Sequence, residues 1–404
     1  MKLTRYQKTV MLILALTQFT VVLDFMIMAP LGEQLIKDLH LTTTQFGTVV
    51  SVYAISAAIS SFLSAAFADR FDRKRLLLFF YTGFILGTLF CGLAAAYETM
   101  LAARIFTGIF GGVLSSVALA IVADCFEPHL RGRVMGTIQM GFSVSQVIGI
   151  PAGLWIAHQW NWHVTFYGVA CLTVFVWMGI LFFLKPINQH VLASVSQNPL
   201  RHLVLTLTNR DHQKGFLAVS VLSLGGFLIM PFTTTFLVNN VHITQAQLPL
   251  IFMITGLSSM VVLPLIGRLS DRFNRMRIFI VGSIIAMLMV SLYTRMQPLP
   301  YQWVMLINVI LFAGIMSRMV PAMALNAQLP QAQYRGAFMS INSSIQQLSG
   351  GIASFLAGHI VVQKTPTAPL LHFERLGNIM VILMLICLVL VYRVYTCVNK
   401  LNLK

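Results

Sequence analysis

Twelve apolar runs, each long enough to cross a lipid bilayer, follow one another along this 404-residue chain. A spanning helix needs roughly 20 apolar residues, because each residue advances the helix by about 1.5 Å. Backbone polar groups in lipid must bond within the segment, so these runs are predicted to be helices. They fall at 9–31, 45–66, 75–97, 101–123, 134–157, 163–184, 215–238, 246–267, 277–296, 302–325, 337–362 and 376–397. The predicted fold class is therefore an all-α membrane protein with twelve transmembrane helices.

The composition excludes the common soluble classes. Hydrophobic residues make up 57% of the chain and charged residues 9%, whereas soluble domains average about 45–50% and about 25%. The five cysteines lie in or beside apolar runs without disulfide or ligand spacing, and the ten histidines are scattered, so no metal site is predicted. The short basic start leads straight into the first run without a cleavage site, which predicts an uncleaved first helix.

The basic residues predict the orientation. Lys and Arg number 27 against 11 Asp and Glu, and on a soluble chain this excess would indicate nucleic-acid binding. Here the basic residues cluster in alternate short loops: 21 lie on one side, four on the other and two within helices. Cytoplasmic loops carry the excess of Lys and Arg in membrane proteins, so both termini are predicted to be cytoplasmic. No nucleic-acid partner is expected.

The chain has an internal repeat. A polar stretch at 185–214 separates a six-helix segment at 1–184 from a second at 215–404. The sequence Asp-Arg-Phe-Asp-Arg at 69–73 recurs as Asp-Arg-Phe-Asn-Arg at 271–275, each in the loop between the second and third helices of its half. Parallel six-helix repeats are one plan of membrane transporters. We therefore expect two bundles joined by a cytoplasmic linker.

Three motifs resemble those of the major facilitator superfamily. The loop at 65–74, AAFADRFDRK, resembles the superfamily signature Gly-x-Leu-Ala-Asp-Arg-x-Gly-Arg-Lys, with Ala65 and Asp72 in place of its glycines. Arg104 and Gly108 resemble the Arg-x-x-x-Gly motif of proton-coupled members. The sequence GIPAG at 149–153 is similar to the antiporter motif, in the form closest to the arabinose-efflux-permease-like group. The resemblance implies two pseudo-symmetric six-helix bundles, with helices 1, 4, 7 and 10 lining a central cavity.

The first motif and its repeat predict a set of cytoplasmic contacts. A carboxylate at a membrane surface can interact with the positive end of a neighbouring helix, and Asp124 is placed to pair with Arg73 or Arg70. Such a latch can hold the two halves closed on the inside. The alternative is that these charges only fix topology. The candidate latch residues are Asp69, Arg70, Arg73, Asp124, Asp271 and Arg272.

The antiporter motif predicts a kink in the fifth helix. Pro151 removes a backbone hydrogen bond, and Gly149 and Gly153 allow another backbone to approach closely. We expect this segment to pack against its partner helix in the other half. The alternative is a kink without bearing on transport direction.

Two charges within the membrane predict proton coupling. Asp24 is the only ionisable residue between Lys8 and Glu33, so it lies in the middle of the first helix. A carboxylate there costs about 2.5–3.5 kcal/mol on insertion scales, and in a dry site it binds a proton more readily than in water. Arg104 in helix 4 is its expected partner. A permanently paired structural carboxylate is the alternative.

A third intramembrane charge and several apolar side chains predict a substrate site. Arg318 in helix 10 has no acidic residue in its own half at that depth, so it would attract an anionic group or reach toward interior water. Methionine side chains adapt to varied shapes, which suits a permissive cavity. The candidate substrate-binding residues are Asp24, Met26, Gln139, Met230, Phe232, Asn308, the repeat counterpart of Arg104, and Arg318, with Phe25 and Met140 beside them.

These features predict a secondary transporter of the bacterial inner membrane that works by alternating access. The leading hypothesis is proton-coupled export of small amphipathic compounds or sugars, with Asp24 carrying the proton. The alternative is uptake of a small anionic or zwitterionic metabolite anchored by Arg318 and Arg104. A membrane enzyme is disfavoured because no nucleophile–base or phosphate-binding motif is present, and a sensor because no output domain is visible. The expected partners are a small-molecule substrate, protons and membrane lipids, with no cofactor and a monomeric state.

Overall fold

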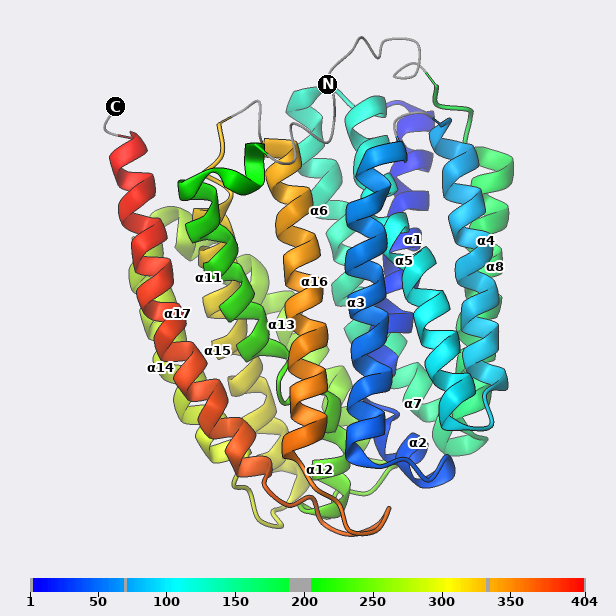
Figure 1. Ribbon diagram of the computed structural model, residues 1–404, viewed down its shortest axis with the longest axis vertical. Helices are drawn as coiled ribbons and strands as arrows, with labels where there is room; N and C mark the ends of the chain where they lie inside the picture. Colours follow the sequence, from blue (N-terminus) through cyan, green and yellow to red (C-terminus); the bar gives the residue numbers. More distant parts are fainter. Residues whose placement is uncertain (1–2, 69–70, 189–204, 332–334, 403–404) are drawn as a thin grey trace. The chain divides into compact units, whose positions relative to one another are not determined.

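The computed structural model describes residues 3–68, 71–188, 205–331 and 335–402, and helices make up almost all of this part of the chain (Figure 1). In the first half the helices are α1 (Arg5–Ile27), α2 (Gly32–Asp38), α3 (Thr43–Phe67), α4 (Arg73–Leu93), α5 (Tyr97–Cys125), α6 (Pro128–Val144), α7 (Ile150–Gln159) and α8 (Trp162–Phe183). In the second half they are α11 (Arg210–Phe227), α12 (Thr233–Asn239), α13 (Leu248–Arg272), α14 (Arg275–Tyr293), α15 (Tyr301–Asn326), α16 (Arg335–Ile360) and α17 (Phe373–Asn402).

The predicted all-α membrane fold is confirmed. Within the described part of the chain, 11 helical segments are long and apolar enough to cross a bilayer. The helix α16 overlaps the remaining predicted run and has 26 residues, which also reaches across a bilayer. It is more polar than the others because its first half is rich in Ser, Asn and Gln. Each of the twelve predicted runs overlaps a helix, with ends that differ by a few residues.

The contacts within the chain define two compact units. Unit 1 comprises Met1–Leu31 and Val52–Pro199, and unit 2 comprises Gly32–Ser51 and Leu200–Lys404. The division into 1–184, 185–214 and 215–404 stays a prediction, and residues 189–204 of the predicted linker lie outside the described residues. Residues 32–51 precede most of unit 1 in the sequence but pack with unit 2. The N-terminal third of α3 therefore belongs to a different unit from the rest of that helix.

Polar side chains at the helix starts explain where several helices begin. Thr4 and Gln7 form a capping box at the start of α1, with hydrogen bonds of 3.1 Å in both directions. The Asp72 side chain accepts from the Arg75 amide at 2.9 Å and so caps α4. Its repeat counterpart Asn274 caps α14 by accepting from the Met276 amide at 2.9 Å. The repeat in the loop sequence therefore has the same structural role in both units.

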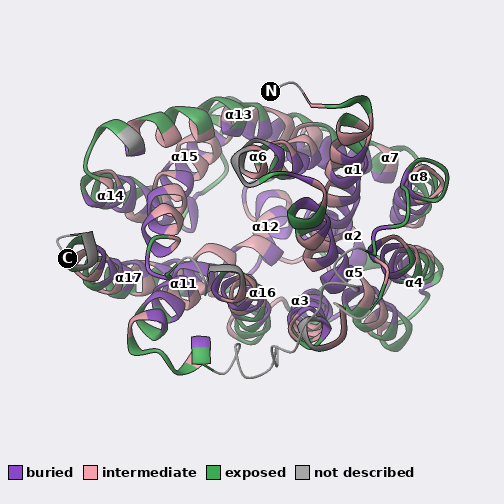
Figure 2. Cartoon of the chain, turned by 90° about the horizontal axis from the view of Figure 1, so that it is seen from above, coloured by how far each residue is buried: buried purple, intermediate pink, exposed green. Residues whose placement is uncertain are grey.

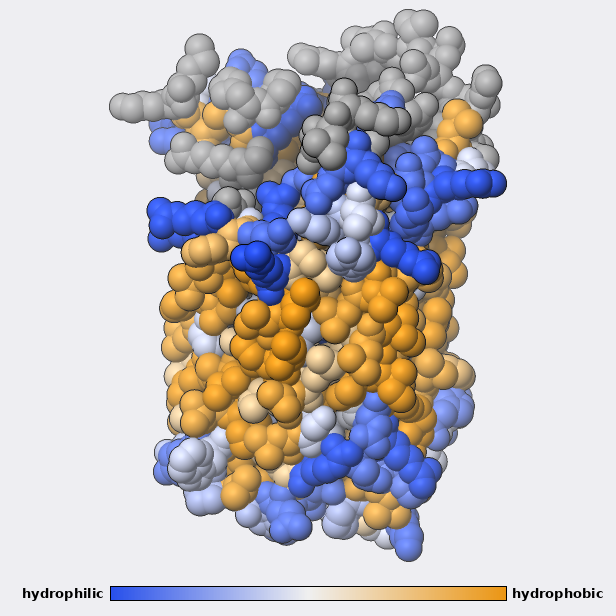
Figure 3. All heavy atoms as spheres, turned by 90° about the vertical axis from the view of Figure 1, so that its left-hand side faces the viewer, coloured by the Kyte–Doolittle hydropathy of each residue, from blue (hydrophilic) through white to orange (hydrophobic). Residues whose placement is uncertain are grey.

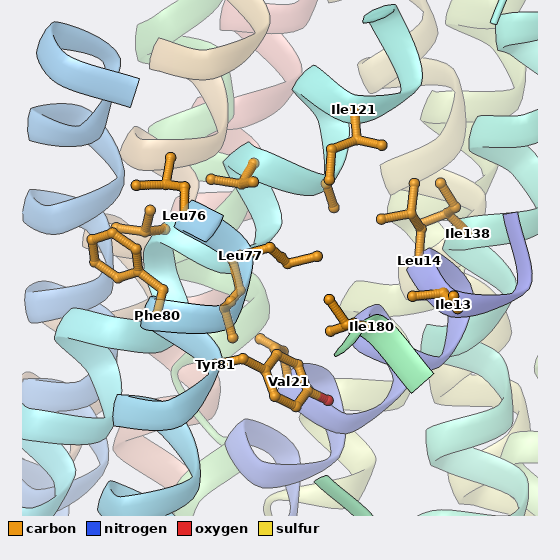
Figure 4. Packing of buried hydrophobic residues seen from close by; sticks show 14 of the residues in the cluster. Ile13, Leu14, Val21, Leu76, Leu77, Phe80, Tyr81, Ile121, Ile138 and Ile180 are labelled. Atoms are coloured by element: carbon orange, nitrogen blue, oxygen red, sulfur yellow. The ribbon is translucent and has the colours of Figure 1, made fainter. Parts of the chain in front are cut away.

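The core of unit 1 is an apolar cluster to which α1, α4, α5, α6 and α8 contribute (Figure 4). Leu14 of α1, Leu77 of α4, Ile121 of α5, Ile138 of α6 and Ile180 of α8 are all at most 2% exposed. Figure 2 shows the matching pattern in α4 and α8, whose buried faces turn toward the rest of unit 1 and whose exposed faces turn away. Burial of these faces against one another, together with internal backbone bonding, explains why the unit is a packed helix bundle.

Two glycines of α5 bring that helix against α3. A Cβ atom on Gly108 would lie 2.5 Å from the Tyr53 carbonyl oxygen, and one on Gly112 would lie 2.6 Å from the Ala57 Cα. Both partners are backbone atoms, so larger residues would force the helices apart. The spacing of four residues places both glycines on one face of α5. This close approach brings Tyr53 near the side chain of Arg104, one turn earlier in α5.

The predicted kink in the fifth helix takes the form of a π-helical turn. Residues Ser145–Gly149 are π-helical between α6 and α7, and the Ile150 amide donates to the Ser145 carbonyl five residues earlier. Pro151 follows directly, and its missing N–H explains why the α-helical bonding pattern shifts here.

The glycines of this segment pack against α1 of the same unit, and the expected packing against the other half stays a prediction. A Cβ atom on Gly149 would lie 2.6 Å from Leu23 Cδ1, and one on Gly153 would lie 2.6 Å from Ile27 Cδ1, both in α1 of the same unit. The Ser145 hydroxyl also lies 3.0 Å from the Phe19 carbonyl oxygen of α1. Small residues four apart on this helix face a row of α1 residues four apart, so the contact forms within unit 1.

Unit 2 has a broken first helix and an apolar surface band. Between α11 and α12 lies the 3₁₀ turn Met230–Phe232, where Pro231 cannot donate a backbone hydrogen bond. Figure 3 shows the side of the molecule that carries α14 and α17, where hydrophobic residues form a broad band between hydrophilic ends. Such a band matches the hydrocarbon layer of a membrane.

Replacement of Gly112 by alanine tests the close contact of α3 with α5. We expect Gly112→Ala to lower the free energy of unfolding by about 1–3 kcal/mol, because the new methyl group meets the backbone of Ala57. The measurement is the apparent melting temperature of the purified protein in detergent. The matched control is Gly168→Ala in α8, where no atom lies within 4 Å of the added Cβ. Equal melting temperatures for the two variants would contradict the close contact.

Candidate functional site

The centre of unit 1 contains a buried ion pair between α1 and α5. Arg104 Nη1 lies 2.9 Å from Asp24 Oδ2, and both side chains are 0% exposed. The same nitrogen lies 3.4 Å from the Asp24 backbone carbonyl oxygen. The sequence predicted this pairing, and the structure brings the two residues together. Because removal of two charges from water is expensive, the pair is weak evidence for stability and stronger evidence for function.

Two further side chains complete the surroundings of this pair. The Thr88 hydroxyl of α4 donates to Asp24 Oδ1 at 3.0 Å, so both carboxylate oxygens have a donor. The Tyr53 ring of α3 lies 4.3 Å from the Arg104 guanidinium carbon, a cation–π contact, and stacks on Phe25 at 5.4 Å between ring centroids. Four helices of unit 1 therefore converge on one charged centre.

The Arg104 guanidinium has unused hydrogen-bonding capacity. Its Nε and Nη2 atoms are buried and have no hydrogen-bond partner among the described residues. Nearby, the Cys91 thiol lies 3.7 Å from the Thr107 hydroxyl. Buried donors without acceptors are costly, and the Cys91 thiol is a polar group next to this side of Arg104.

Among the described residues of unit 2, the corresponding region carries no such pair. At an offset of 202 residues, Phe25-Met26-Ile27-Met28 matches Phe227-Leu228-Ile229-Met230, and Gly226 stands where the first half has Asp24. Asn308, the predicted counterpart of Arg104, lies near the buried Tyr293 hydroxyl, which has no hydrogen-bond partner among the described residues. The ionisable pair is therefore specific to the first repeat.

The structure places the other predicted substrate residues in different environments. In unit 1, Met26 is 7% exposed within the packed part of α1, whereas Gln139 is exposed and Met140 is 57% exposed on α6. In unit 2, Met230 and Phe232 lie in the 3₁₀ turn, with Met230 half-buried and Phe232 packed edge-on against Phe46 at 5.7 Å. Their role in substrate binding stays a prediction.

Arg318 lies between helices of unit 2. Its side chain is 2% exposed, its Nε donates to the Ser283 hydroxyl of α14 at 3.1 Å, and its guanidinium carbon lies 5.6 Å from the Phe279 ring. It also contacts Cys387 of α17. Among the described residues no carboxylate pairs with it. The Arg318 side chain therefore contacts residues of the neighbouring helices α14 and α17.

The predicted cytoplasmic latch is partly described. Arg73 Nε lies 3.0 Å from Asp124 Oδ2, and Arg73 Nη1 donates to the Ala68 carbonyl oxygen at 2.9 Å. Arg73 begins α4 and Asp124 lies near the end of α5, so this pair lies within unit 1, and the role of the latch in closing the two halves stays a prediction. Asp69 and Arg70 lie outside the described residues, as does the side chain of Asp271, and Arg272 is exposed.

Sequence reasoning missed Thr88 and Tyr53. Each is a single polar residue within an apolar run, and such residues are common in transmembrane helices, where they bond to their own backbone. The only available signal was their helix position relative to Asp24 and Arg104, which depends on how the helices pack.

The comparisons with known proteins agree on one family. The family model of the Major Facilitator Superfamily matches residues 14–354 and 215–400. The uncharacterized MFS-type transporter YbcL of Bacillus subtilis (strain 168) is 24% identical over 375 residues, covering 92% of this chain and 93% of YbcL. Multidrug resistance protein 2 of the same organism is 25% identical, covering 69% and 72%. The putative transporter AraJ of Escherichia coli (strain K12) is 23% identical, covering 70% of each chain.

Solved structures show the same fold. A bacterial homolog of the human lysosomal transporter Spinster matches with a TM-score of 0.79 and 15% identity, covering 99% of both chains. A D-xylose-proton symporter matches with a TM-score of 0.76 and 16% identity, covering 95% of this chain and 97% of that one.

A double-variant experiment tests the coupling of Asp24 with Arg104. We expect Arg104→Gln alone to lower the free energy of unfolding by about 3–5 kcal/mol, because it leaves a buried carboxylate without its counter-charge. The double variant Asp24→Asn/Arg104→Gln should regain part of this loss, since no buried charge remains. The measurement is the apparent melting temperature in detergent. Losses that simply add in the double variant would contradict the pairing.

Proposed function

The chain belongs to the Major Facilitator Superfamily, and on that premise we propose that it exports small amphipathic compounds or sugars in exchange for protons. It is a multi-pass membrane transporter that works by secondary active transport. The buried pair of Asp24 and Arg104 is the observation that carries the proposal. A proton on Asp24 removes its negative charge and weakens its hold on Arg104, while a substrate oxygen can accept from the two unpartnered nitrogens. Proton and substrate then compete for one site.

The relatives support the export direction. Two of them are named multidrug resistance proteins, and a carrier of varied compounds needs adaptable cavity walls. The 22 methionines of the chain include Met26, Met140 and Met230 beside the predicted cavity positions. These names and residues favour amphipathic substrates.

The uptake of a small anionic or zwitterionic metabolite is the second candidate. It depends on Arg318 as an anchor, and its support is the absence of a carboxylate partner among the described residues. The contacts of Arg318 with Ser283 and Phe279 favour a packing role, so export remains the first candidate.

The cellular setting follows from the same observations. The bacterial relatives and the basic loops support an inner-membrane location with both termini in the cytoplasm. In that orientation the Arg73–Asp124 pair lies at the cytoplasmic ends of α4 and α5. We assign it the role of holding these helices together in one state of the cycle.

Proton flux in proteoliposomes tests the proposal. An imposed pH gradient is read with an internal dye while drugs, sugars and amino acids are added one at a time. We expect a substrate-dependent collapse of the gradient with the unaltered protein and its loss with Asp24→Asn, because the variant cannot exchange a proton.

The matched control is Asp211→Asn, which removes an exposed carboxylate paired with Lys214 and should leave the flux unchanged. A collapse with Asp24→Asn equal to that of the unaltered protein would overturn the role of Asp24. Equilibration of labelled anions without any proton flux would instead support uptake.

A further inference from the structure

A second buried carboxylate, Glu33, has no role in the proposed function. It lies in α2, nine residues after Asp24, and it is 5% exposed. The chain passes from unit 1 into unit 2 between Leu31 and Gly32. Two buried carboxylates therefore stand on either side of that border in the chain, one in each unit.

Glu33 is held by a side-chain amide from a distant part of the sequence. Gln245, in the loop before α13, donates from Nε2 to Glu33 Oε2 at 2.5 Å. Gln34 Nε2 in turn donates to Gln245 Oε1 at 3.3 Å. One glutamine thus joins α2 to the second half of the chain through two hydrogen bonds.

The start of α3 continues this contact along α16. The Thr43 hydroxyl donates to the Val361 carbonyl oxygen at 2.7 Å, and the Thr44 hydroxyl donates to the Gly358 carbonyl oxygen at 3.1 Å. These carbonyls lie at the C-terminal end of α16, where the last turn of a helix has no intrahelical donors. The two threonines therefore satisfy acceptors that would otherwise need water.

Glycines and aromatic rings complete the docking of this segment. A Cβ atom on Gly47 would lie 2.8 Å from the Gly358 Cα, so the two backbones are in direct contact. Phe46 packs edge-on against Phe232. Side-chain hydrogen bonds of this kind contribute only about 0.5–1.5 kcal/mol each, so the charge state of one partner can change how firmly residues 32–51 are held to the rest of unit 2.

Burial raises the pKa of the Glu33 carboxyl, and the nearby Asp38 raises it further, while Lys37 and the hydrogen bond from Gln245 oppose the rise. Lys37 and Asp38 belong to α2 itself. The helical elements that pack most closely against α2 are α12 and the 3₁₀ turn Met230–Phe232, and neither carries a titratable residue. The loop that supplies Gln245 carries one, His242. The proton equilibrium of Glu33 therefore depends on whether the segment is docked.

The difference in the pKa of Glu33 between the docked and the released segment determines how docking varies with pH. A glutamic acid in water has a pKa of about 4.3, and the docked carboxyl has a higher one. The docked segment consequently binds the proton more tightly than the released segment does. Docking is fully favoured at low pH and is lost as the pH rises through the raised pKa.

We propose that Glu33 is a second proton-binding residue of the transport cycle, which takes up a proton when residues 32–51 dock onto the rest of unit 2 and loses it when they separate. The inference rests on the proposed function only for the existence of a cycle in which this segment moves. On the side predicted to face away from the cytoplasm, a low pH then favours docking. A transporter that imports protons has to close its outer side after it has bound a proton from outside, and docking at low pH favours this closure.

Hydrogen–deuterium exchange of the full chain in detergent tests the proposal. The amides of residues 32–51 are followed at about pH 4, near the ordinary pKa of a glutamic acid, and at about pH 8. Comparison of the unaltered protein with Glu33→Gln at each pH removes the intrinsic pH dependence of exchange. The amide side chain still accepts from Gln245 but cannot ionise.

We expect equal protection of this segment in both proteins at the lower pH. At the higher pH the unaltered protein should exchange faster than Glu33→Gln, by up to about tenfold for each pH unit above the raised pKa. The control Glu374→Gln removes an exposed carboxylate of unit 2, 47% exposed, and should behave as the unaltered protein does.

A second variant tests the proposal even where Glu33→Gln does not fold. Lys37 is exposed, and Lys37→Gln removes the charge that lowers the pKa of Glu33, so the loss of protection should move to higher pH. An unchanged transition with Lys37→Gln, or identical exchange in the unaltered protein and Glu33→Gln at both pH values, would overturn the proposal. Because exchange reports docking and not transport, this result is independent of the proton flux of Asp24→Asn.

Discussion

The charge pair of Asp24 and Arg104 sets the main constraint on this structure. Both side chains are fully buried, and an isolated charge in such a place costs several kcal/mol. The pair persists because Thr88 donates to the carboxylate and the Tyr53 ring covers the guanidinium. The charges are thus partly compensated by their neighbours, and two hydrogen-bond donors of Arg104 remain without acceptors among the described residues.

The packing of the helices in unit 1 positions the residues that surround this pair. Gly108 and Gly112 allow α5 to touch the backbone of α3, which places Tyr53 over Arg104. On α1, the residues next to Asp24 face the π-helical turn and the glycines of the fifth membrane segment. The polypeptide then leaves unit 1 a few residues after Asp24 and enters unit 2 at Gly32.

Local patterns predicted the helices and the ion pair, because hydrophobic length and isolated intramembrane charges are visible in the sequence itself. The pairing of Asp124 with Arg73 followed in the same way from its loop position. The surroundings of the pair were not predictable, since the position of Thr88 or Tyr53 depends on which helix faces touch. Gly149 and Gly153 illustrate this limit: their small size predicted close packing, but not that α1 would be the neighbour. The grouping of residues 32–51 with unit 2 likewise depends on contacts between residues over 200 positions apart.

Infrared difference spectroscopy of the purified protein tests the central claim most directly, because it detects the protonated carboxyl group itself. Spectra are recorded during a pH titration of the unaltered protein, Asp24→Asn and the exposed-carboxylate variant Asp211→Asn. The account predicts a titrating carboxyl band, separate from that of Glu33, that is present in the unaltered protein and in Asp211→Asn, and absent in Asp24→Asn. Spectra of Asp24→Asn that lose no titrating carboxyl band relative to the unaltered protein would contradict the claim that Asp24 exchanges a proton.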